Sequence, residues 1–259
     1  MLIALGVIFA AAGLVLARLF YLASRRPSND PQSYLQKEAG ANARCVVCAG
    51  DSLTHASFSG DYVSVLRERL APRGYTFVNA GVNGDTTEDL LRRLDSIIAC
   101  KPSAVSILIG TNDCRQGPID AARGNLSEIL ARLSRETQAR IAVLSIPPLG
   151  EDLGSSTNQR VVAYNALVRE LASTHGVEYL PLHETLCTSI ERAALPPSAL
   201  EFNAALVLSV GLRRYLLGRG WDDIAHENGL AVLTDQLHTS QRAAALIADV
   251  IARWLEQHA

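Results

Sequence analysis

The stretch RCVVCAGDSLT, residues 44–54, decides the fold class because it joins an apolar run to a polar turn. Its first six residues, 44–49, are short and mostly apolar, as in a strand that is buried on both faces of a sheet. The turn Gly50, Asp51, Ser52 follows, and the spacing of apolar residues after it predicts a helix over 53–70. A buried strand that leads directly into a helix is typical of a parallel sheet covered by helices.

Outward from this stretch, short apolar runs and helical patterns alternate along most of the chain. Further strands are predicted over residues 75–79, 104–109, 141–146 and 177–180, and further helices over 86–98, 119–133, 158–174 and 241–257. Repeated βαβ units predict an α/β fold, a three-layer α/β/α sandwich with a parallel sheet of flavodoxin-like type. In such sheets the site lies at the carboxyl ends of the strands.

The composition agrees with a globular domain and excludes some function classes. The chain has 259 residues, of which 48% are hydrophobic and 19% charged, so it is neither disordered nor fibrous. A net charge of -2 without any run rich in Lys and Arg argues against nucleic-acid binding. Five cysteines, an odd number in a chain of this size, argue against a disulfide framework.

Cys45 and Cys48 form a C-x-x-C pair inside the apolar run. A redox pair usually opens a helix, and a zinc site needs a second pair at matching spacing, so we interpret both as small core residues. Lone histidines without a partner pattern stand at His175, His183, His226 and His258. We therefore expect neither a metal nor a cofactor.

Polar residues at the ends of the predicted strands supply the groups that acyl transfer needs. They lie in the segments 50–54, 79–85 and 110–113, and a fourth segment, 235–238, precedes the last helix. A serine hydroxyl is a weak nucleophile until a base takes its proton, and a histidine oriented by a carboxylate is such a base. Ser52, His238 and Asp235 meet this requirement, since Asp-x-x-His spacing can place both side chains on the same side of one turn.

The same loops offer donors for the oxyanion that forms when a nucleophile attacks an acyl carbon. The candidates are the N–H of Ser52 at a helix N-terminus, the N–H of Gly84 in a turn, and the side-chain amide of Asn112. Each residue alone has an ordinary structural explanation, such as a helix cap, a turn glycine or a loop amide. Their joint occurrence favours a catalytic interpretation.

The four segments, in this order, resemble the sequence blocks of the SGNH hydrolases, also called GDSL esterases and lipases. The resemblance covers residues 44–259 and implies Ser52 as nucleophile, Gly84 and Asn112 as oxyanion donors with the N–H of Ser52, His238 as base and Asp235 as its partner. The competing α/β-hydrolase scaffold uses a G-x-S-x-G elbow, which this chain lacks. His55, one turn after Ser52, has no carboxylate at orienting spacing, and we expect it at the rim of the site.

The N-terminal segment is predicted to be a membrane anchor over residues 1–23, followed by a linker over 24–43. Residues 1–17 carry no charge, and the apolar character continues to Leu22 after the single Arg18. A helix of about 24 residues reaches about 36 Å, enough to cross a bilayer core of about 30 Å. Arg18, Arg25 and Arg26 follow the apolar stretch, so the positive-inside rule favours a cytoplasmic-facing catalytic domain. A periplasmic location stays open, because a signal-like segment on a hydrolase is also a route to export.

A helical insertion is predicted at about 190–229, where the chain is longer than a compact sheet protein needs. Apolar helix patterns cover 199–217 and 221–227, just before the Asp-x-x-His segment. One interpretation is an extra helical pair packed on the body. The other is a lid or acyl-binding wall that includes Phe202, Leu206 or Val210.

Taken together, the resemblance implies a serine ester hydrolase of carboxylesterase, lysophospholipase or thioesterase type that works through an acyl-enzyme. The expected partners are a small-molecule ester or lipid substrate and, through the N-terminal helix, a membrane. The alternative is an acetylesterase or O-acyltransferase that acts on envelope saccharides. A binding module on an inactive scaffold is disfavoured because every catalytic group is present, and the oligomeric state stays open.

Overall fold

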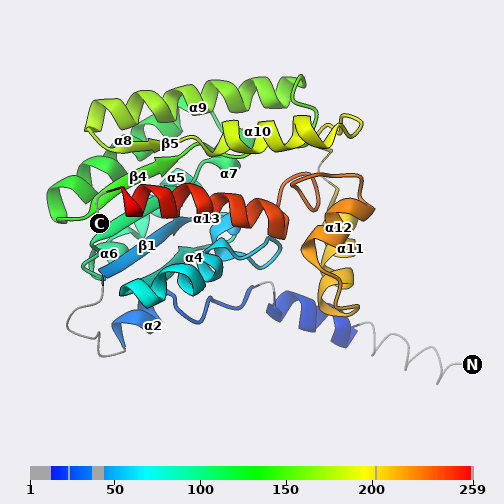
Figure 1. Ribbon diagram of the computed structural model, residues 1–259, viewed down its shortest axis with the longest axis horizontal. Coiled ribbons are helices and arrows are strands. Elements are labelled where there is room, and N and C mark those ends of the chain that lie inside the picture. The colour runs from blue at the N-terminus through cyan, green and yellow to red at the C-terminus, as the bar shows by residue number, and fades with distance from the viewer. Residues whose placement is uncertain (1–12, 23, 37–43, 202, 258–259) are drawn as a thin grey trace, which may run out of the picture.

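A computed structural model describes residues 13–22, 24–36, 44–201 and 203–257 (Figure 1). Five parallel strands form one sheet in the order β2-β1-β3-β4-β5. The strands are β1 (Arg44–Gly50), β2 (Tyr75–Gly81), β3 (Ala104–Leu108), β4 (Arg140–Leu144) and β5 (Glu178–Leu180). In the register of the sheet, Gly50 at the end of β1 lies opposite Gly81 on β2 and opposite Leu108 on β3.

Helices cover both faces of the sheet, as Figure 1 shows. They are α2 (Pro31–Leu35), α3 (Ser52–His55), α4 (Tyr62–Leu70), α5 (Thr87–Arg92), α6 (Leu94–Ile98), α7 (Thr111–Gln116), α8 (Ile119–Glu136), α9 (Ser156–His175), α10 (Leu182–Ala193), α11 (Ala204–Tyr215), α12 (Trp221–Glu227) and α13 (Gln241–Glu256), with a 3-10 turn at Ala71–Arg73.

Strand alternation divides the core into two layers. Val47 and Ala49 of β1 pack with residues of α5, α6, α8 and α9, whereas Val46 and Cys48 pack with residues of α4, α10 and α13. All four side chains are at most 1% exposed, which is why this run contains no polar residue. The predicted three-layer arrangement around a parallel sheet is confirmed. All five cysteines are free thiols, and Cys45 and Cys48 are core residues.

Several helices differ from the sequence prediction. The helix expected over 53–70 is two helices, because Ala56 adopts a left-handed conformation (φ 66°) that ends α3. The helix expected over 86–98 is interrupted at Arg93, between α5 and α6. Neither α7 nor α10 was predicted, and α7 has only six residues, too few for a periodic signal.

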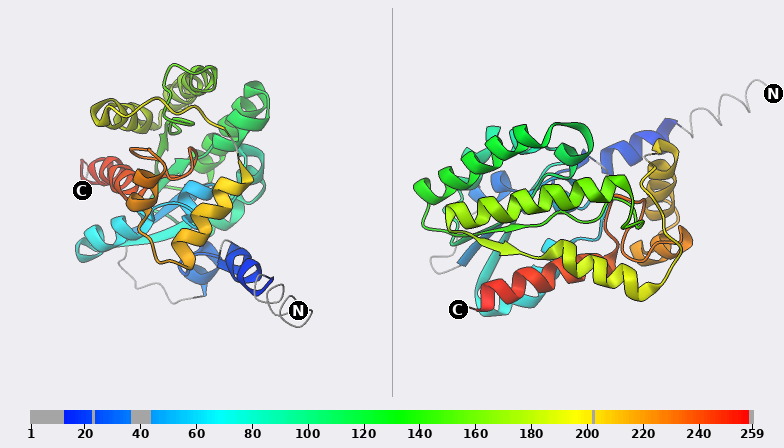
Figure 2. Two further views of the ribbon diagram at one scale, coloured as in Figure 1. Left: turned by 90° about the vertical axis from the view of Figure 1, so that its right-hand side faces the viewer. Right: turned by 90° about the horizontal axis from the view of Figure 1, so that it is seen from above.

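The prediction of a membrane-spanning N-terminal helix is wrong: of the helices in the described ranges, none is both long and apolar enough to span a membrane. Residues 13–22 are helical, and residues 1–12 and 23 of the predicted anchor lie outside the described residues. Within the helix, Leu19 is 6% exposed and lies beside Gly211 of α11. Figure 2 shows this helix running next to α11. An apolar side chain in this stretch is therefore buried against protein.

Part of the predicted linker packs along the edge strand β2. The backbone N–H of Asn79 donates to the carbonyl of Asn29 (3.0 Å), and the Asn29 amide donates to the carbonyl of Phe77 (2.9 Å). Asp30 caps α2 by accepting from the N–H of Ser33 (2.8 Å). Residues 24–36 thus cover part of an edge that would otherwise present unpaired backbone groups. Residues 37–43 of the predicted linker lie outside the described residues.

Candidate active site

Ser52 occupies the first position of α3, directly after β1. Asp51 is the N-cap and accepts a hydrogen bond from the N–H of Leu53 (3.0 Å), so its side chain closes the strand-to-helix turn. Gly50 and Gly81 allow the turn to pack tightly: a Cβ on Gly50 would clash with the Leu108 carbonyl, and one on Gly81 with the His55 backbone. The turn therefore presents the Ser52 hydroxyl at the carboxyl end of the central strand.

Asp235 and His238 lie at the tip of a short hairpin that brings them to Ser52. The hairpin is closed by the N–H of Thr234, which donates to the His238 carbonyl (2.7 Å). His238 Nδ1 lies 2.7 Å from Asp235 Oδ2, and His238 Nε2 lies 3.2 Å from Ser52 Oγ. Because an ionised carboxylate only accepts hydrogen bonds, Nδ1 carries the proton and Nε2 is the acceptor for the Ser52 hydroxyl. This tautomer is the one that a general base requires.

The electrostatics of the pair favour an ionised Asp235. Burial raises the pKa of Asp235, but the charge and hydrogen bonds of His238 outweigh it and leave this pKa below its usual value. Burial likewise lowers the pKa of His238, yet the Asp235 charge and hydrogen bond outweigh it and leave this pKa above its usual value. The carboxylate thus stabilises the imidazolium that would form when His238 takes a proton.

Asp51 is a second buried carboxyl group next to the site. It is 0% exposed, and burial raises its pKa to about 7. Within the described part of the chain, its Oδ2 atom has no hydrogen-bond partner. The negative charge of Asp51 also raises the pKa of His238, so the two groups are electrostatically linked.

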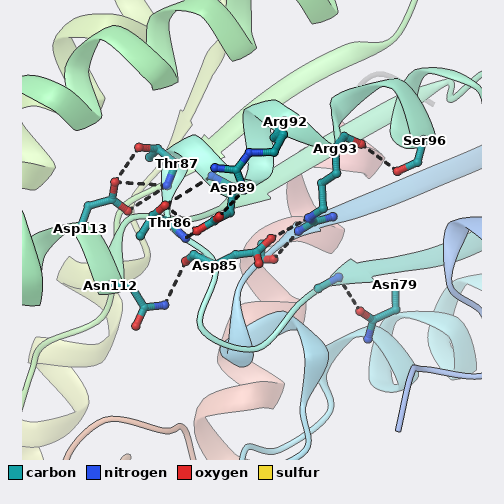
Figure 3. A network of polar contacts seen from close by, with 12 residues as sticks. Asn79, Asp85, Thr86, Thr87, Asp89, Arg92, Arg93, Ser96, Asn112 and Asp113 are labelled. Atoms are coloured by element: carbon teal, nitrogen blue, oxygen red, sulfur yellow. Dashed lines mark hydrogen bonds and ion pairs between the residues drawn. The ribbon is translucent and has the colours of Figure 1, made fainter. Parts of the chain in front are cut away.

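The loop after β2 brings Asp85, the residue after Gly84, into contact with Asn112 of α7. The Asn112 side-chain amide donates to the backbone carbonyl of Asp85 (2.9 Å), as Figure 3 shows. Gly84 has φ +81°, a left-handed conformation that glycine adopts without strain. One amide hydrogen of Asn112 is thereby used to orient the side chain, which leaves the other for a ligand.

Arg93 ties this loop to the Ser52 turn. Its Nε donates to Asp85 Oδ2 (2.6 Å), and its Nη2 donates to the carbonyl of Gly50 (2.9 Å). Another buried carboxylate, Asp113, accepts from the N–H of Thr87 (3.0 Å) and fixes α7 against α5. Hydrogen bonds thus connect the three segments that carry Ser52 at the start of α3, Gly84 in the loop after β2, and Asn112 at the start of α7.

Phe58 borders the site and was not singled out from the sequence. Its ring lies 5.9 Å from that of His238 and 6.4 Å from that of Tyr215 on α11, and the Tyr215 hydroxyl donates to the carbonyl of Ser57. Tyr215 of α11, in the predicted insertion, therefore lies behind the Phe58 ring that contacts His238. Arg93 and Asp85 were also missed, because contacts set by packing leave no spacing signal.

His55 takes no part in the chain of groups from Ser52 to Asp235. It is partly buried, and burial lowers its pKa. It lines a cavity of about 600 Å³ between the N-terminal segment and the loop after β2, together with Phe20, Val82 and Arg93. Among the described residues, no group of three or more His, Cys, Asp or Glu side chains could hold a metal ion.

Comparison with known proteins bears on the same residues. The model of the GDSL-like lipase/acylhydrolase family matches residues 48–205, which include Ser52, Gly84 and Asn112. Esterase TesA of Pseudomonas aeruginosa is 34% identical over 116 residues, 42% of this chain and 58% of that protein. A multidomain esterase of Ruminococcus flavefaciens is 25% identical over 170 residues, 62% of this chain and 22% of that protein. The chain therefore spans less than two thirds of each of these relatives.

Solved structures share the fold at low identity. A lipase/acylhydrolase from Enterococcus faecalis superposes with a TM-score of 0.59 at 20% identity, covering 83% of this chain and 96% of the other. An acetylxylan esterase from Geobacillus stearothermophilus gives 0.61 at 17% identity, covering 83% and 95%. The resemblance expected from the four sequence blocks is confirmed by the family match, which covers more than half of the chain. With the fold and the matched segments in agreement, the chain belongs to the GDSL-like lipase/acylhydrolase family.

Proposed function

We propose that the protein hydrolyses carboxylic esters through an acyl-enzyme on Ser52. One observation carries the proposal, which is a continuous hydrogen-bonded series of three side chains. Ser52 Oγ lies 3.2 Å from His238 Nε2, and on the other side of the imidazole His238 Nδ1 lies 2.7 Å from Asp235 Oδ2. A serine, a base in the matching tautomer and an orienting carboxylate are the requirements of nucleophilic acyl transfer.

In this mechanism His238 Nε2 takes the hydroxyl proton as Ser52 Oγ forms a bond to the acyl carbon. The carbonyl oxygen becomes an oxyanion, and the imidazolium is stabilised by Asp235. Collapse of the tetrahedral intermediate breaks the bond to the alcohol oxygen, which receives the proton from His238. Water then attacks the acyl-enzyme with His238 again as base, which releases the carboxylic acid and restores Ser52.

We assign the oxyanion to the backbone N–H groups of Ser52 and Gly84 and to the free amide hydrogen of Asn112. Ser52 is at the N-terminus of α3, where backbone N–H groups have no partner within the helix. Asn112 is 6% exposed and is oriented by its bond to the Asp85 carbonyl. Donors that are oriented before the reaction stabilise developing charge without reorganisation.

The substrate class is proposed as esters with an apolar acyl group, on the ground of the walls around His238. Phe58 and, behind it, Tyr215 supply an aromatic surface next to the base. The alternative, removal of acetyl groups from saccharides, is the activity named for the solved acetylxylan esterase, whose likeness at 17% identity concerns the fold alone. Among the described residues, none of the contacts around Ser52 and His238 favours that alternative.

A panel of esters tests the proposal. We expect hydrolysis of 4-nitrophenyl acetate, butyrate and octanoate by the wild type and no turnover by Ser52→Ala, because that variant lacks the nucleophile. Higher kcat/KM for butyrate and octanoate than for acetate supports an apolar acyl group. Activity on acetylated xylo-oligosaccharides that exceeds activity on all three would favour the alternative. Turnover by Ser52→Ala equal to wild type would refute the proposed nucleophile.

A further inference from the structure

Glu151 is a buried carboxylate in the loop between β4 and α9, and its contacts converge on one place. Its Oε2 accepts from the N–H of Ala231 (2.7 Å), and its Oε1 accepts from the N–H groups of Val232 (2.8 Å) and Leu233 (2.9 Å). The residue is 6% exposed. Three consecutive backbone donors on one carboxylate form a concave anion-binding turn, here filled by a side chain of the same protein.

These three donors form the base of the hairpin that carries Asp235 and His238. The N–H of Ser240 donates to the Val232 carbonyl (2.8 Å), and Leu233 pairs with Thr239 across the hairpin. Because the hairpin is only a few residues long, the orientation of its base determines where its tip points. Glu151 therefore acts on the strand that leads directly into Asp235.

The same loop also holds the tip of the hairpin. The N–H of Gly150 donates to the carbonyl of Gln236 (2.7 Å), between Asp235 and His238. Gln236 has φ +69°, a conformation that costs free energy for a residue with a Cβ and persists only when its surroundings fix it. Gly150 itself has φ +70°, and a Cβ there would clash with the backbone of Leu200, so on its other side the loop packs closely against residues 198–200.

Simple stability is a weak explanation for this arrangement. A buried charge is costly to desolvate, and three amide donors could have been satisfied by neutral acceptors at lower cost. Charge-assisted hydrogen bonds are shorter and stronger than neutral ones, and their geometry is correspondingly stiff. A stiff support is what a base requires when a displacement of about 1 Å can cost about 100-fold in rate.

We propose that Glu151 is a positioning residue that fixes the Asp235–His238 hairpin against Ser52. The inference rests on the proposed function, since it concerns the base of that reaction. Glu151 touches neither the reacting atoms nor His238 itself. It acts through the backbone of residues 231–233, and its removal loosens the approach of His238 Nε2 to Ser52 Oγ.

The test compares Glu151→Gln with a matched variant, Asp30→Asn. Asp30 is also a buried carboxylate (8% exposed) that accepts a backbone N–H, from Ser33, but it lies on the N-terminal segment beside β2. Glutamine at 151 keeps the size but places an N–H donor where an acceptor is needed. We expect kcat on 4-nitrophenyl butyrate to fall about 10- to 100-fold in Glu151→Gln with KM little changed, and to stay at the wild-type value in Asp30→Asn.

A pH profile separates positioning from a general loss of stability. The charged groups that face His238 are Asp235, Asp51 and Arg115. A looser contact with Asp235 stabilises the imidazolium less. The apparent pKa in the pH profile of kcat/KM is therefore expected to be lower in Glu151→Gln than in the wild type, and to equal the wild-type value in Asp30→Asn. Glu151→Asp, which keeps the charge on a shorter side chain, is expected to lie between Glu151→Gln and wild type, and it replaces Glu151→Gln if that variant does not fold.

The outcomes are distinct. Lowered kcat and a shifted pH profile at temperatures where the variant is folded support the inference. A lowered melting temperature with wild-type kcat and pH profile would overturn it, because Glu151 would then be structural only. A wild type that hydrolyses no ester and is not labelled by a fluorophosphonate would instead refute the proposed function.

Discussion

Asn112 is the side chain whose role in catalysis can be tested most cleanly at the scale of a residue. Asn112→Ala removes one of the proposed oxyanion donors and is expected to lower kcat about 100- to 1,000-fold with little change in KM. Asn125→Ala is the matched control, because the Asn125 amide donates to the Thr87 hydroxyl (3.3 Å). Steady-state kinetics on 4-nitrophenyl butyrate decides the matter. A large rise in KM at constant kcat would make Asn112 a substrate-binding residue.

His238 makes the rate depend on pH in a direction that follows from its environment. The base must be neutral, so kcat/KM is expected to rise with pH through the pKa of His238. Asp235 and Asp51 leave this pKa above the ordinary value, so the rise is expected at a higher pH than for a free imidazole. Asp51→Asn removes one of these negative charges and should shift the rise to lower pH. A profile that is unchanged in this variant would contradict the electrostatic link.

The sequence was sufficient to propose these residues, but not the contacts that hold them. Ser52, Gly84, Asn112 and the Asp-x-x-His segment each follow or precede a recognisable element, so their types and order could be read directly. Glu151, in contrast, meets residues 231–233 about 80 positions later in the chain. A contact of this kind depends on how two loops pack and has no periodic signal.

At the scale of elements, α11 and α12 raise the question of whether they are core or wall of the site. Val210 is 0% exposed and packs with Trp221 and Ile224 in a small cluster of its own, whereas Leu206 is half-buried. Phe202, the third residue considered from the sequence, lies outside the described residues. We therefore expect Val210 to be a core residue and Leu206 to be part of the wall of the site.

Val210→Ala is expected to cost about 1 to 3 kcal/mol of folding free energy without altering the preference between butyrate and octanoate, because it leaves a small void in a packed cluster. Leu206→Ala is expected to change stability less and chain-length preference more, by about 1 to 3 kcal/mol. Thermal unfolding and kcat/KM ratios measured on the same samples check both. An altered ratio in Val210→Ala alone would reverse the assignment.

Element boundaries were less predictable than element types. The strands could be located because each is a short apolar run, and the break between α3 and α4 could not, because the left-handed Ala56 carries no signal in its residue type. The N-terminal helix, residues 13–22, shows a further limit of prediction from sequence. Hydropathy reports that a segment avoids water, but it does not report whether lipid or protein covers it, and Leu19 is covered by protein.

At the scale of the whole molecule, residues 24–36 pack along the edge strand β2 of the central sheet. Asn29→Ala removes the side-chain hydrogen bond to the Phe77 carbonyl and is expected to lower the free energy of unfolding by about 0.5 to 1.5 kcal/mol. Urea unfolding should remain a single transition, since the segment packs on the central sheet. Esterase kinetics are expected to be unchanged. A separate early transition in the wild type would show that this segment unfolds independently.

An activated Ser52 nucleophile is the central requirement of the proposed reaction. Labelling of the protein by a fluorophosphonate, followed by mass spectrometry of its peptides, tests this requirement most directly. We expect one adduct per wild-type chain, on Ser52, no adduct in Ser52→Ala, and labelling of His238→Ala that is slower by orders of magnitude because the hydroxyl keeps its proton. An adduct on any other residue, or equal labelling of wild type and Ser52→Ala, would contradict the account.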